Sequence, residues 1–238
     1  MDGRLVNLRF GLIVPSCNTV IEPEFRKVLS ESCMLHSSRV SCKVANLSTL
    51  QKMEKETINE AIKLADADVD LIIYGCTTGS LFRGPSHYLE LQKNIEETTG
   101  IPTITTAGAV VDALRFLDMH KVCVATPYVD ELNRVETAFL TKTGFEVVEL
   151  KSLYIPNGVA MGRINPEEIY RFVKSLRYDL SDGIFISCTN LPTISIIAQL
   201  EDELKVPVIS SNTSTFWKAL RKIGSTLRIM GYGKLLEA

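Results

Sequence analysis

Two stretches of this sequence follow the same order of strand-like and loop-like segments, at a shift of about 110 residues. The run FGLIVPSCNTVIEPEF is matched by VCVATPYVDELNRV, LIIYGCTTGS by GIFISCTNLP, and IPTITTAGAVVDAL by VPVISSNTSTFWKAL. The match includes more than apolar residues, because Cys76 aligns with Cys188 and Pro102 with Pro207. The repeat predicts two similar halves, although generic strand–helix units could produce such a match by coincidence.

Within each half, short apolar runs bounded by Gly, Pro or Ser alternate with longer amphipathic stretches. This alternation is typical of an α/β fold with a mainly parallel sheet. The predicted strands are FGLIV, the VSCKVANL region, VDLIIYG, PTIT, KVCVAT, FEVVELKSL, DGIFIS and VPVIS. Apolar residues recur at helical spacing in the predicted helices, which span residues 51–67, 107–118, 129–143, 166–177 and 193–204.

Composition limits the class of partner. The chain has 238 residues, of which 45% are hydrophobic, so a sizeable core is possible. Its 26 basic and 28 acidic side chains are mixed along the sequence, which argues against a nucleic-acid or anionic-lipid partner. No segment reaches the roughly 18 apolar residues of a membrane span, and the first apolar run is too short for a signal peptide. We therefore expect a cytoplasmic protein with a small ligand, and neither nucleic acid nor membrane as partner.

The six cysteines are scattered without a C-x-x-C pair, and only three histidines accompany them. Neither a disulfide framework nor a zinc site is indicated. Cys123 lies inside a predicted strand, and we interpret it, with Cys33 and Cys42, as apolar packing. Cys76 and Cys188 instead end predicted strands, where amides at a helix start lower a thiol pKa. If two similar halves face one another, these two reactive thiols lie on opposite sides of one cleft.

Small polar loops follow several predicted strands, at the edge where open α/β sheets bind ligands. The loops PSCNT, CTTGS, TPY and SCTN would offer amides and hydroxyls to an anion. Asn18 could bind a carboxylate or only cap the first helix. Tyr128 could donate a hydrogen bond into the cleft or only cover the sheet. Asn157 lies in a turn-rich segment long enough to act as a lid, although turn asparagines are also common for backbone reasons.

Other residues near these loops receive structural interpretations. Cys17 is interpreted as a spacer of serine size rather than a third reactive thiol. Arg83 and His87 lie just beyond the CTTGS loop, and we interpret both as solvated surface residues. The PSCNT loop lacks the G-x-G-x-x-G pattern, so a dinucleotide site is poorly supported.

Six stretches of the chain resemble the maleate isomerase and arylmalonate decarboxylase group of the aspartate/glutamate racemase superfamily: GLIVPSCNTVIEPEF, YGCTTGS, ATPY, ISCTNLPTISIIAQLE, VPVISSNTSTFWKALR and GYGKLL. The resemblance runs nearly end to end. It implies two pseudo-symmetric Rossmann-like α/β halves, with parallel sheets and the active site in the cleft between them, and no metal or organic cofactor. We expect residues 1–106 plus 212–238 to form the N-terminal half and residues 107–211 the C-terminal half.

The resemblance also implies roles for single residues. Cys76 and Cys188 would be the catalytic thiols. The substrate carboxylates would be held by polar residues, namely Asn18, Tyr128 and Asn157, with the amides of Thr77, Thr78 and Thr189. Decarboxylases of this group keep a cysteine only at the position of Cys188, so two thiols favour isomerase or racemase chemistry. The TTGS and FRG stretches depart from the isomerases of the group, and FRG is similar to the decarboxylases.

The leading hypothesis is a maleate cis–trans isomerase or a close relative, in which Cys76 adds to the alkene and Cys188 transfers the proton. The alternatives are a cofactor-independent racemase and an arylmalonate-type decarboxylase acting on another small carboxylate, including a member of the ectoine-utilisation type. A third hypothesis is a non-catalytic module that binds a dicarboxylate. We expect a small carboxylate or dicarboxylate substrate, and a homodimer or higher homo-oligomer.

Overall fold

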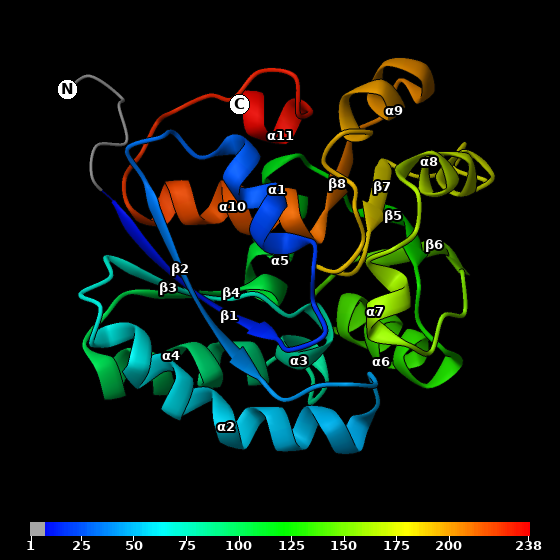
Figure 1. The fold of residues 1–238 in the computed structure, drawn as a ribbon. Coiled ribbons are helices and arrows are strands. Elements are labelled where there is room, and N and C mark those ends of the chain that lie inside the picture. Colours follow the sequence, from blue (N-terminus) through cyan, green and yellow to red (C-terminus); the bar gives the residue numbers. More distant parts are fainter. Residues whose placement is uncertain (1–7) are drawn as a thin grey trace.

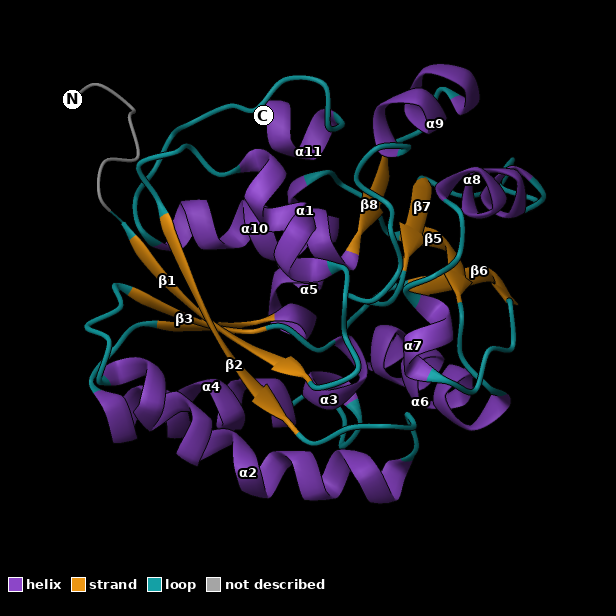
Figure 2. Cartoon of the chain, in the orientation of Figure 1, coloured by secondary structure: helices purple, strands orange, loops and turns teal. Residues whose placement is uncertain are grey.

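A computed structural model describes residues 8–238, and its strands form two separate four-stranded parallel sheets, as Figure 1 and Figure 2 show. The first sheet has the order β2-β1-β3-β4 and the second the order β6-β5-β7-β8. The strands of the first sheet are β1 (Arg9–Pro15), β2 (Met34–Val40), β3 (Leu71–Tyr74) and β4 (Thr103–Thr105). The strands of the second sheet are β5 (Lys121–Thr126), β6 (Glu146–Ser152), β7 (Gly183–Ile186) and β8 (Val208–Ser210).

Both sheets are built in the same register. Phe10 of β1 pairs with Leu71 of β3, and Val122 of β5 pairs with Gly183 of β7 in the second sheet. The same shift along the chain relates Cys76, which follows β3, to Cys188, which follows β7. The predicted α/β fold with two pseudo-symmetric halves is therefore confirmed.

Helices cover both faces of the first sheet. Figure 1 shows α1 and α10 on one face and α2 and α4 on the other. The helices up to the end of β4 are α1 (Ile21–Val28), α2 (Leu47–Ala65), α3 (Thr77–Leu81) and α4 (His87–Thr99). The later helices are α5 (Thr106–Phe116), α6 (Asp130–Lys142), α7 (Gly158–Met161), α8 (Pro166–Lys174), α9 (Ile197–Leu204), α10 (Ser211–Lys222) and α11 (Lys234–Glu237).

The core follows from strand geometry, because successive side chains point to opposite faces of a sheet. In β1, Phe10, Leu12 and Val14 belong to one buried cluster, whereas Ile13 belongs to another. The first cluster also contains Val124 of β5 and residues of α5 and α10, so it is shared by the two halves. Helix α10 follows β8 and contacts it, but it also contacts β3 and β4 of the first sheet and packs most extensively against α5. Its contacts with β3 and β4 support our proposal that residues 212–238 belong with the N-terminal half.

The second predicted strand is wrong in its position. The structure places β2 at Met34–Val40, and only Val40 of the predicted VSCKVANL region belongs to it. Strand β2 lies at the edge of its sheet and most of its side chains are exposed or half-buried, so it lacks the apolar pattern used to find strands. The long helices α4 and α10 and the short helices α3, α7 and α11 are also absent from the predicted set. Among the described residues, no helix is both long and apolar enough to cross a membrane.

Candidate active site

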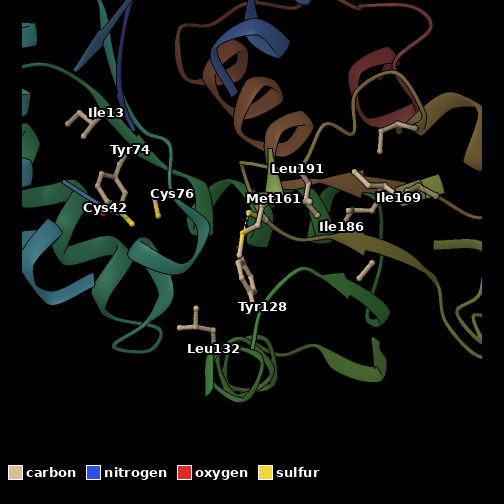
Figure 3. Close-up of a cluster of buried hydrophobic side chains, with 14 of the residues drawn as sticks. Ile13, Cys42, Tyr74, Cys76, Tyr128, Leu132, Met161, Ile169, Ile186 and Leu191 are labelled. Carbon is tan, nitrogen blue, oxygen red and sulfur yellow. Dashed lines mark hydrogen bonds between the residues drawn. The ribbon is translucent and has the colours of Figure 1, made fainter. Parts of the chain in front are cut away.

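A cavity lies where the carboxyl ends of the strands of both sheets meet. Figure 3 shows Cys42 and Cys76 of the first half opposite Tyr128 and Met161 of the second. The residues that line it come from several loops and helix starts: Pro15, Cys17, Asn18, Cys42, Ala45, Leu50, Cys76, Thr77, Thr78, Tyr128, Gly158, Met161, Cys188, Thr189 and Asn190. The structure therefore brings together every predicted site residue except Asn157.

Cys76 caps the short helix α3 at its start. Its backbone is extended, and the N–H of Gly79 donates to its sulfur at 3.3 Å. Burial raises the pKa of the Cys76 thiol to about 11, although the Gly79 amide and the Thr78 hydroxyl lower it. The sulfur is thus held at a helix start, as predicted, but the protonated form of the thiol is favoured.

Cys188 occupies the equivalent place after β7, with a different backbone. Its φ is +107°, a left-handed conformation that favours glycine. The N–H of Cys188 donates to the Ser211 hydroxyl at 3.0 Å, and its sulfur accepts from the N–H of Asn190 at 3.3 Å. Burial raises the pKa of the Cys188 thiol to about 12, against the lowering effect of the Asn190 amide and the Tyr128 hydroxyl.

The helix-start amides lower the pKa of both thiols, as expected, but the net pKa of each thiol is raised. The amides are present and act in the expected direction, but burial outweighs them because it removes solvent from the charged form. Burial is the main cause of the raised pKa of Cys188. A negative charge on Cys76 raises this pKa further, so the two thiols are close enough to interact.

The positive φ of Cys188 predicts a difference in stability between two variants at this position. Cys188→Gly and Cys188→Ala both remove the thiol, but only glycine adopts a positive φ without strain. We expect the glycine variant to be more stable than the alanine variant by about 1 kcal/mol. Urea unfolding of the two variants measures the difference, and equal or reversed stabilities would contradict a strained Cys188.

Hydroxyls and amides link the two cysteine loops across the cavity. Asn18 Nδ2 donates to the Thr189 hydroxyl at 3.0 Å, and that hydroxyl donates to the carbonyl of Gly75 at 3.1 Å. The Thr77 hydroxyl donates to the Ser211 hydroxyl at 2.8 Å. Each contact joins one half to the other, so the positions of the two thiols are coupled through the hydrogen bonds.

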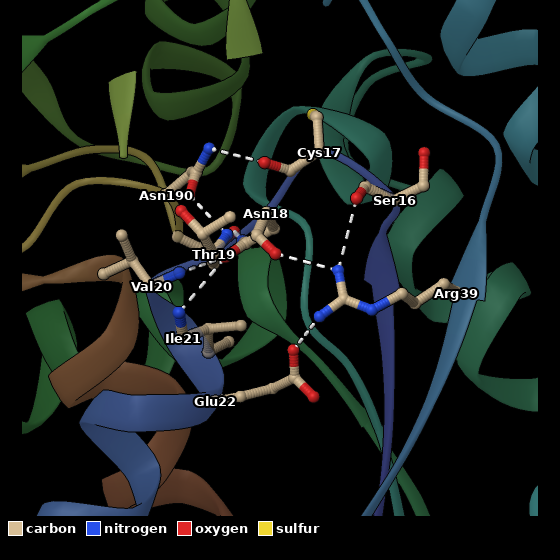
Figure 4. Close-up of polar contacts among 10 residues, drawn as sticks. Ser16, Cys17, Asn18, Thr19, Val20, Ile21, Glu22, Arg39 and Asn190 are labelled. Atoms are coloured by element: carbon tan, nitrogen blue, oxygen red, sulfur yellow. Dashed lines mark hydrogen bonds and ion pairs between the residues drawn. The ribbon is translucent and has the colours of Figure 1, made fainter. Parts of the chain in front are cut away.

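Asn18 combines both interpretations considered for it. Its Oδ1 accepts from the N–H groups of Val20 at 2.9 Å and Ile21 at 3.1 Å, where α1 begins, as Figure 4 shows. Its Nδ2 faces the second half, and the residue is only 1% exposed. The side chain therefore caps the helix and lines the cavity at the same time.

Sequence reasoning missed Asn190, which belongs to the SCTN motif. Its Oδ1 accepts from the N–H of Thr19 at 2.9 Å, and its Nδ2 donates to the carbonyls of Cys17 at 3.3 Å and Gly158 at 2.6 Å. Figure 4 shows this amide between the two halves. The sequence does contain a signal for Asn190, because in the repeat it is the equivalent of Thr78, which we predicted to be a site residue.

Asn157 does not line the cavity. It is exposed, and its Oδ1 accepts from the N–H groups of Val159 at 2.9 Å and Ala160 at 3.2 Å, so it caps α7. The next residue, Gly158, does line the cavity, and Met161 of the same helix has its sulfur 4.0 Å from that of Cys188. A substrate-binding role for Asn157 stays a prediction.

His87 differs from its interpretation as a surface residue, because it is 3% exposed. Its Nε2 lies 3.2 Å from the carbonyl of Gly79, so its ring supports α3 from behind. Arg83 is about half exposed and forms an ion pair with Glu54 at 2.7 Å. These residues contact the back of the Cys76 helix rather than the cavity.

Cys42 belongs to a buried apolar cluster, as expected, but it also lines the cavity, and so does Cys17, which we interpreted as a spacer. The Cys42 thiol donates to the Cys17 sulfur and lowers the pKa of Cys17 to about 7, against the effect of burial. The charge of Arg39 adds to the lowering, and its guanidinium also donates to the carbonyl of Asn18 at 2.9 Å. Cys17 therefore has more thiolate character than Cys76 or Cys188.

We expect iodoacetamide at neutral pH to modify Cys17 about tenfold or more faster than Cys76 and Cys188, because the thiolate is the reactive form. Peptide mass spectrometry after short exposure measures the order. Cys42→Ala is the matched variant: without the donor, the pKa of Cys17 rises and its labelling slows. Labelling of Cys76 before Cys17 would contradict this order.

Among the described residues, no group of three or more His, Cys, Asp or Glu side chains is arranged to hold a metal ion. Four cysteines line the cavity together with neutral hydrogen-bond donors, and two of them, Cys76 and Cys188, follow equivalent strands of the two halves. Such a site is suited to adding a nucleophile at one atom of a small ligand and moving a proton at a neighbouring atom.

Comparison with known proteins agrees with the sequence resemblance. A family model described as arylmalonate decarboxylase matches residues 10–236. Maleate isomerase of Geobacillus stearothermophilus is 30% identical, over 97% of this chain and 98% of that protein. Arylmalonate decarboxylase of Bordetella bronchiseptica is 31% identical over 77% of this chain and 78% of that protein.

A solved structure is also similar in three dimensions. It is that of a cysteine-to-serine mutant of the Nocardia farcinica maleate cis-trans isomerase with a covalently bound succinylcysteine intermediate. The TM-score is 0.93 at 25% identity, with 97% of this chain and 98% of that chain covered. Since the family model and the maleate isomerases span nearly the whole chain, the protein belongs to the arylmalonate decarboxylase family, which here includes the maleate isomerases.

Proposed function

We propose that this protein is a maleate cis–trans isomerase that works through two cysteines. The observation that carries the proposal is the placement of two buried thiols, Cys76 and Cys188, at equivalent strand ends of one cavity. The full-length similarity to maleate isomerases supports the substrate, and the succinylcysteine intermediate of the Nocardia farcinica enzyme supports a covalent route.

The reaction begins when the Cys76 thiolate forms a bond to one alkene carbon of maleate. The π electrons move to the second alkene carbon and its carboxylate, which becomes an enediolate. The Cys188 thiol gives its proton to that second carbon, and Cys76 then carries a succinyl group. The former double bond is now single and rotates. The Cys188 thiolate removes the proton again, the sulfur–carbon bond at Cys76 breaks, and fumarate leaves.

Neutral groups hold the charge in this scheme. The described residues that line the cavity include no Lys, Arg or His. We assign the binding of the two carboxylates to Asn18, Tyr128 and the hydroxyls and amides of Thr77, Thr78 and Thr189. Asn157 is a further candidate for carboxylate binding, because the next residue, Gly158, lines the cavity. Fixed donors aimed at a developing enediolate stabilise it, and one donor contributes about 3 kcal/mol in well-studied enzymes.

Part of the cavity lining is apolar and offers no hydrogen bond to a carboxylate. Pro15, Ala45, Leu50 and Met161 line the cavity together with the polar groups. Apolar side chains make no hydrogen bonds to a carboxylate, so a carboxylate passing over them during rotation is not held there. We place the donors at the two end positions of the rotation and the apolar residues along its course.

The proposal is tested by incubating the purified protein with maleate and following the alkene protons by NMR. Formation of fumarate without added metal or organic cofactor is the expected result. A panel of arylmalonates, hydantoins and chiral α-substituted acids separates the alternatives. Carbon dioxide release from an arylmalonate would indicate a decarboxylase, and solvent deuterium entering a chiral acid without alkene turnover would indicate a racemase.

A binding module without catalysis gives a different result. It would turn over no member of the panel, and alkylation of both thiols would leave its affinity for a dicarboxylate nearly unchanged. In the proposed isomerase the thiols contact the substrate, so alkylation removes both turnover and binding.

A further inference from the structure

Two buried glutamates lie at equivalent places in the two halves. Pro15 ends β1 and Pro127 follows β5, and Glu24 in α1 and Glu136 in α6 are equally far beyond them along the chain. Glu24 is 4% exposed and Glu136 is 0% exposed. A buried carboxylate is costly unless its oxygens accept hydrogen bonds, so each of these side chains requires an explanation.

Glu24 has a structural explanation. Its Oε1 accepts from the N–H groups of Thr193 at 2.6 Å and Ile194 at 2.9 Å, and its Oε2 accepts from Nδ2 of Asn212 at 2.7 Å. These contacts tie α1 of the first half to the loop that follows Cys188 in the second. Both oxygens of Glu24 are satisfied, and their partners belong to the junction of the two halves.

Glu136 lacks these partners. The position equivalent to Asn212 is Ala107, which has no amide to donate. The Ser187 hydroxyl lies 2.5 Å from Oε1 of Glu136, and Oε2 is buried without a hydrogen-bond partner among the described residues. Burial raises the pKa of Glu136 to about 7, with Ser187 lowering it. The first half has Gly75 in place of Ser187, so this contact has no counterpart there.

Ser187 connects Glu136 to the active site. It precedes Cys188 in the chain, and its hydroxyl also interacts with the Tyr128 hydroxyl. Burial raises the pKa of Cys188, and the nearby Tyr128 hydroxyl opposes this effect. The titratable groups facing Glu136 are therefore Tyr128 and, beyond it, Cys188. No Lys, Arg or His of the described residues contributes to the pKa of Glu136.

We propose that Glu136 and Ser187 are positioning residues for Cys188: a neutral Glu136 sets the direction of a hydrogen-bond chain through Ser187 and Tyr128 that stabilises the Cys188 thiolate. The orphaned oxygen of Glu136 and the asymmetry with Glu24 both support this role. The role rests on the proposed function, in which Cys188 gives up and recovers a proton in each turnover.

The direction of the chain depends on the charge of Glu136. When Glu136 is neutral, its O–H donates to Ser187, Ser187 donates to Tyr128, and Tyr128 donates to the Cys188 sulfur. Successive hydrogen bonds in one direction strengthen one another. When Glu136 is ionised, the Ser187 hydroxyl donates to the carboxylate instead, and Tyr128 loses its donor. A second negative charge then also lies near the thiolate and disfavours it.

The test is the rate of Cys188 alkylation by iodoacetamide, measured by mass spectrometry at rising pH in the wild-type protein and in Glu136→Gln. Glutamine keeps the shape of the side chain and cannot ionise. We expect equal rates below pH about 7, where Glu136 is neutral. Well above that pH, we expect E136Q to react about tenfold faster, the effect of one pKa unit at Cys188. The same titration of Cys188 in both proteins would overturn the proposal.

Glu24→Gln is the matched control, because it neutralises the equivalent buried carboxylate outside the chain to Cys188. We expect it to lower the melting temperature and to leave the pH dependence of Cys188 alkylation unchanged. A response equal to that of Glu136→Gln would mean that any buried charge has this effect, and would overturn the specific role. If E136Q does not fold, Ser187→Ala breaks the same chain, and Cys188 must then react more slowly than in the wild type.

Measuring the turnover of maleate by the wild type and by E136Q tests the positioning role and the proposed function independently. The ratio of the E136Q rate to the wild-type rate on maleate is expected to rise as the pH passes about 7. If maleate is not converted but Cys188 alkylation responds to E136Q, the proposed function fails and the positioning role stands. If maleate is converted and alkylation does not respond, the positioning role alone fails.

Discussion

Replacing Cys76 by alanine is expected to lower kcat on maleate by at least about 10³-fold, because the covalent step then has no nucleophile. The sulfur of Cys76 is held by the Gly79 amide at the start of α3, and alanine puts no reactive atom in that position. The variant should keep the fold, since the Cys76 side chain is small and lines a cavity. Fumarate formation followed by NMR measures the loss, and circular dichroism checks the fold.

The rival nucleophile is Cys17, whose pKa of about 7 makes it the more ionised thiol at rest. Cys17→Ala should retain measurable turnover, and Cys123→Ala, in the middle of β5 and outside the cavity, should retain nearly all of it. Loss of activity in Cys17→Ala together with turnover in Cys76→Ala would transfer the nucleophilic role to Cys17.

Replacing Cys188 by serine is expected to have a comparable effect on kcat, with a different chemical outcome. The proton transfer slows by at least about 10³-fold, because a serine hydroxyl is a much weaker acid than a thiol. Cys76 can still add to the alkene, and its succinyl adduct should accumulate because the introduced hydroxyl cannot readily take the proton back. Intact-protein mass spectrometry is expected to show a mass increase equal to that of the substrate acid, and peptide mapping to place it on Cys76.

The double variant Cys76→Ala with Cys188→Ser is the control, and it should show no adduct. An adduct on Cys188 in the Cys76→Ala protein would reverse the two roles. Rates near the wild-type value in Cys188→Ser would show that proton transfer uses another group.

The fold was predictable because a parallel α/β sheet has buried central strands that read as apolar runs. The FGLIV, VDLIIYG, KVCVAT and DGIFIS runs all coincide with central strands, and the family predicted from the motifs is confirmed by the comparisons. The edge strand β2 was misplaced for the same reason, since one side of an edge strand has no neighbouring strand.

The site was predictable where a residue follows a strand directly, as Cys76, Thr77, Cys188 and Thr189 do. It was not predictable where contact depends on how loops cross between the halves. Cys42 enters the cavity only because the segment after β2 passes beside the PSCNT loop, where Ser16 bonds to both the N–H and the carbonyl of Cys42.

The balance between burial and hydrogen bonding is another property that a sequence does not contain. Cys76 and Cys17 lie at similar loop positions, yet burial raises one pKa and a neighbouring thiol lowers the other. Glu136 was missed for a related reason, because a charged residue within an amphipathic helix is ordinarily assigned to the solvated face.

The left-handed backbone at Cys188 bears on how proteins of this architecture can diverge. A change from cysteine to glycine at this position relieves strain, so it removes the chemistry while making the polypeptide more robust. A duplicated copy released from selection for catalysis therefore has a favourable path toward an inert binding protein. A cysteine held in a backbone suited to glycine costs stability, as strained residues at reactive sites commonly do.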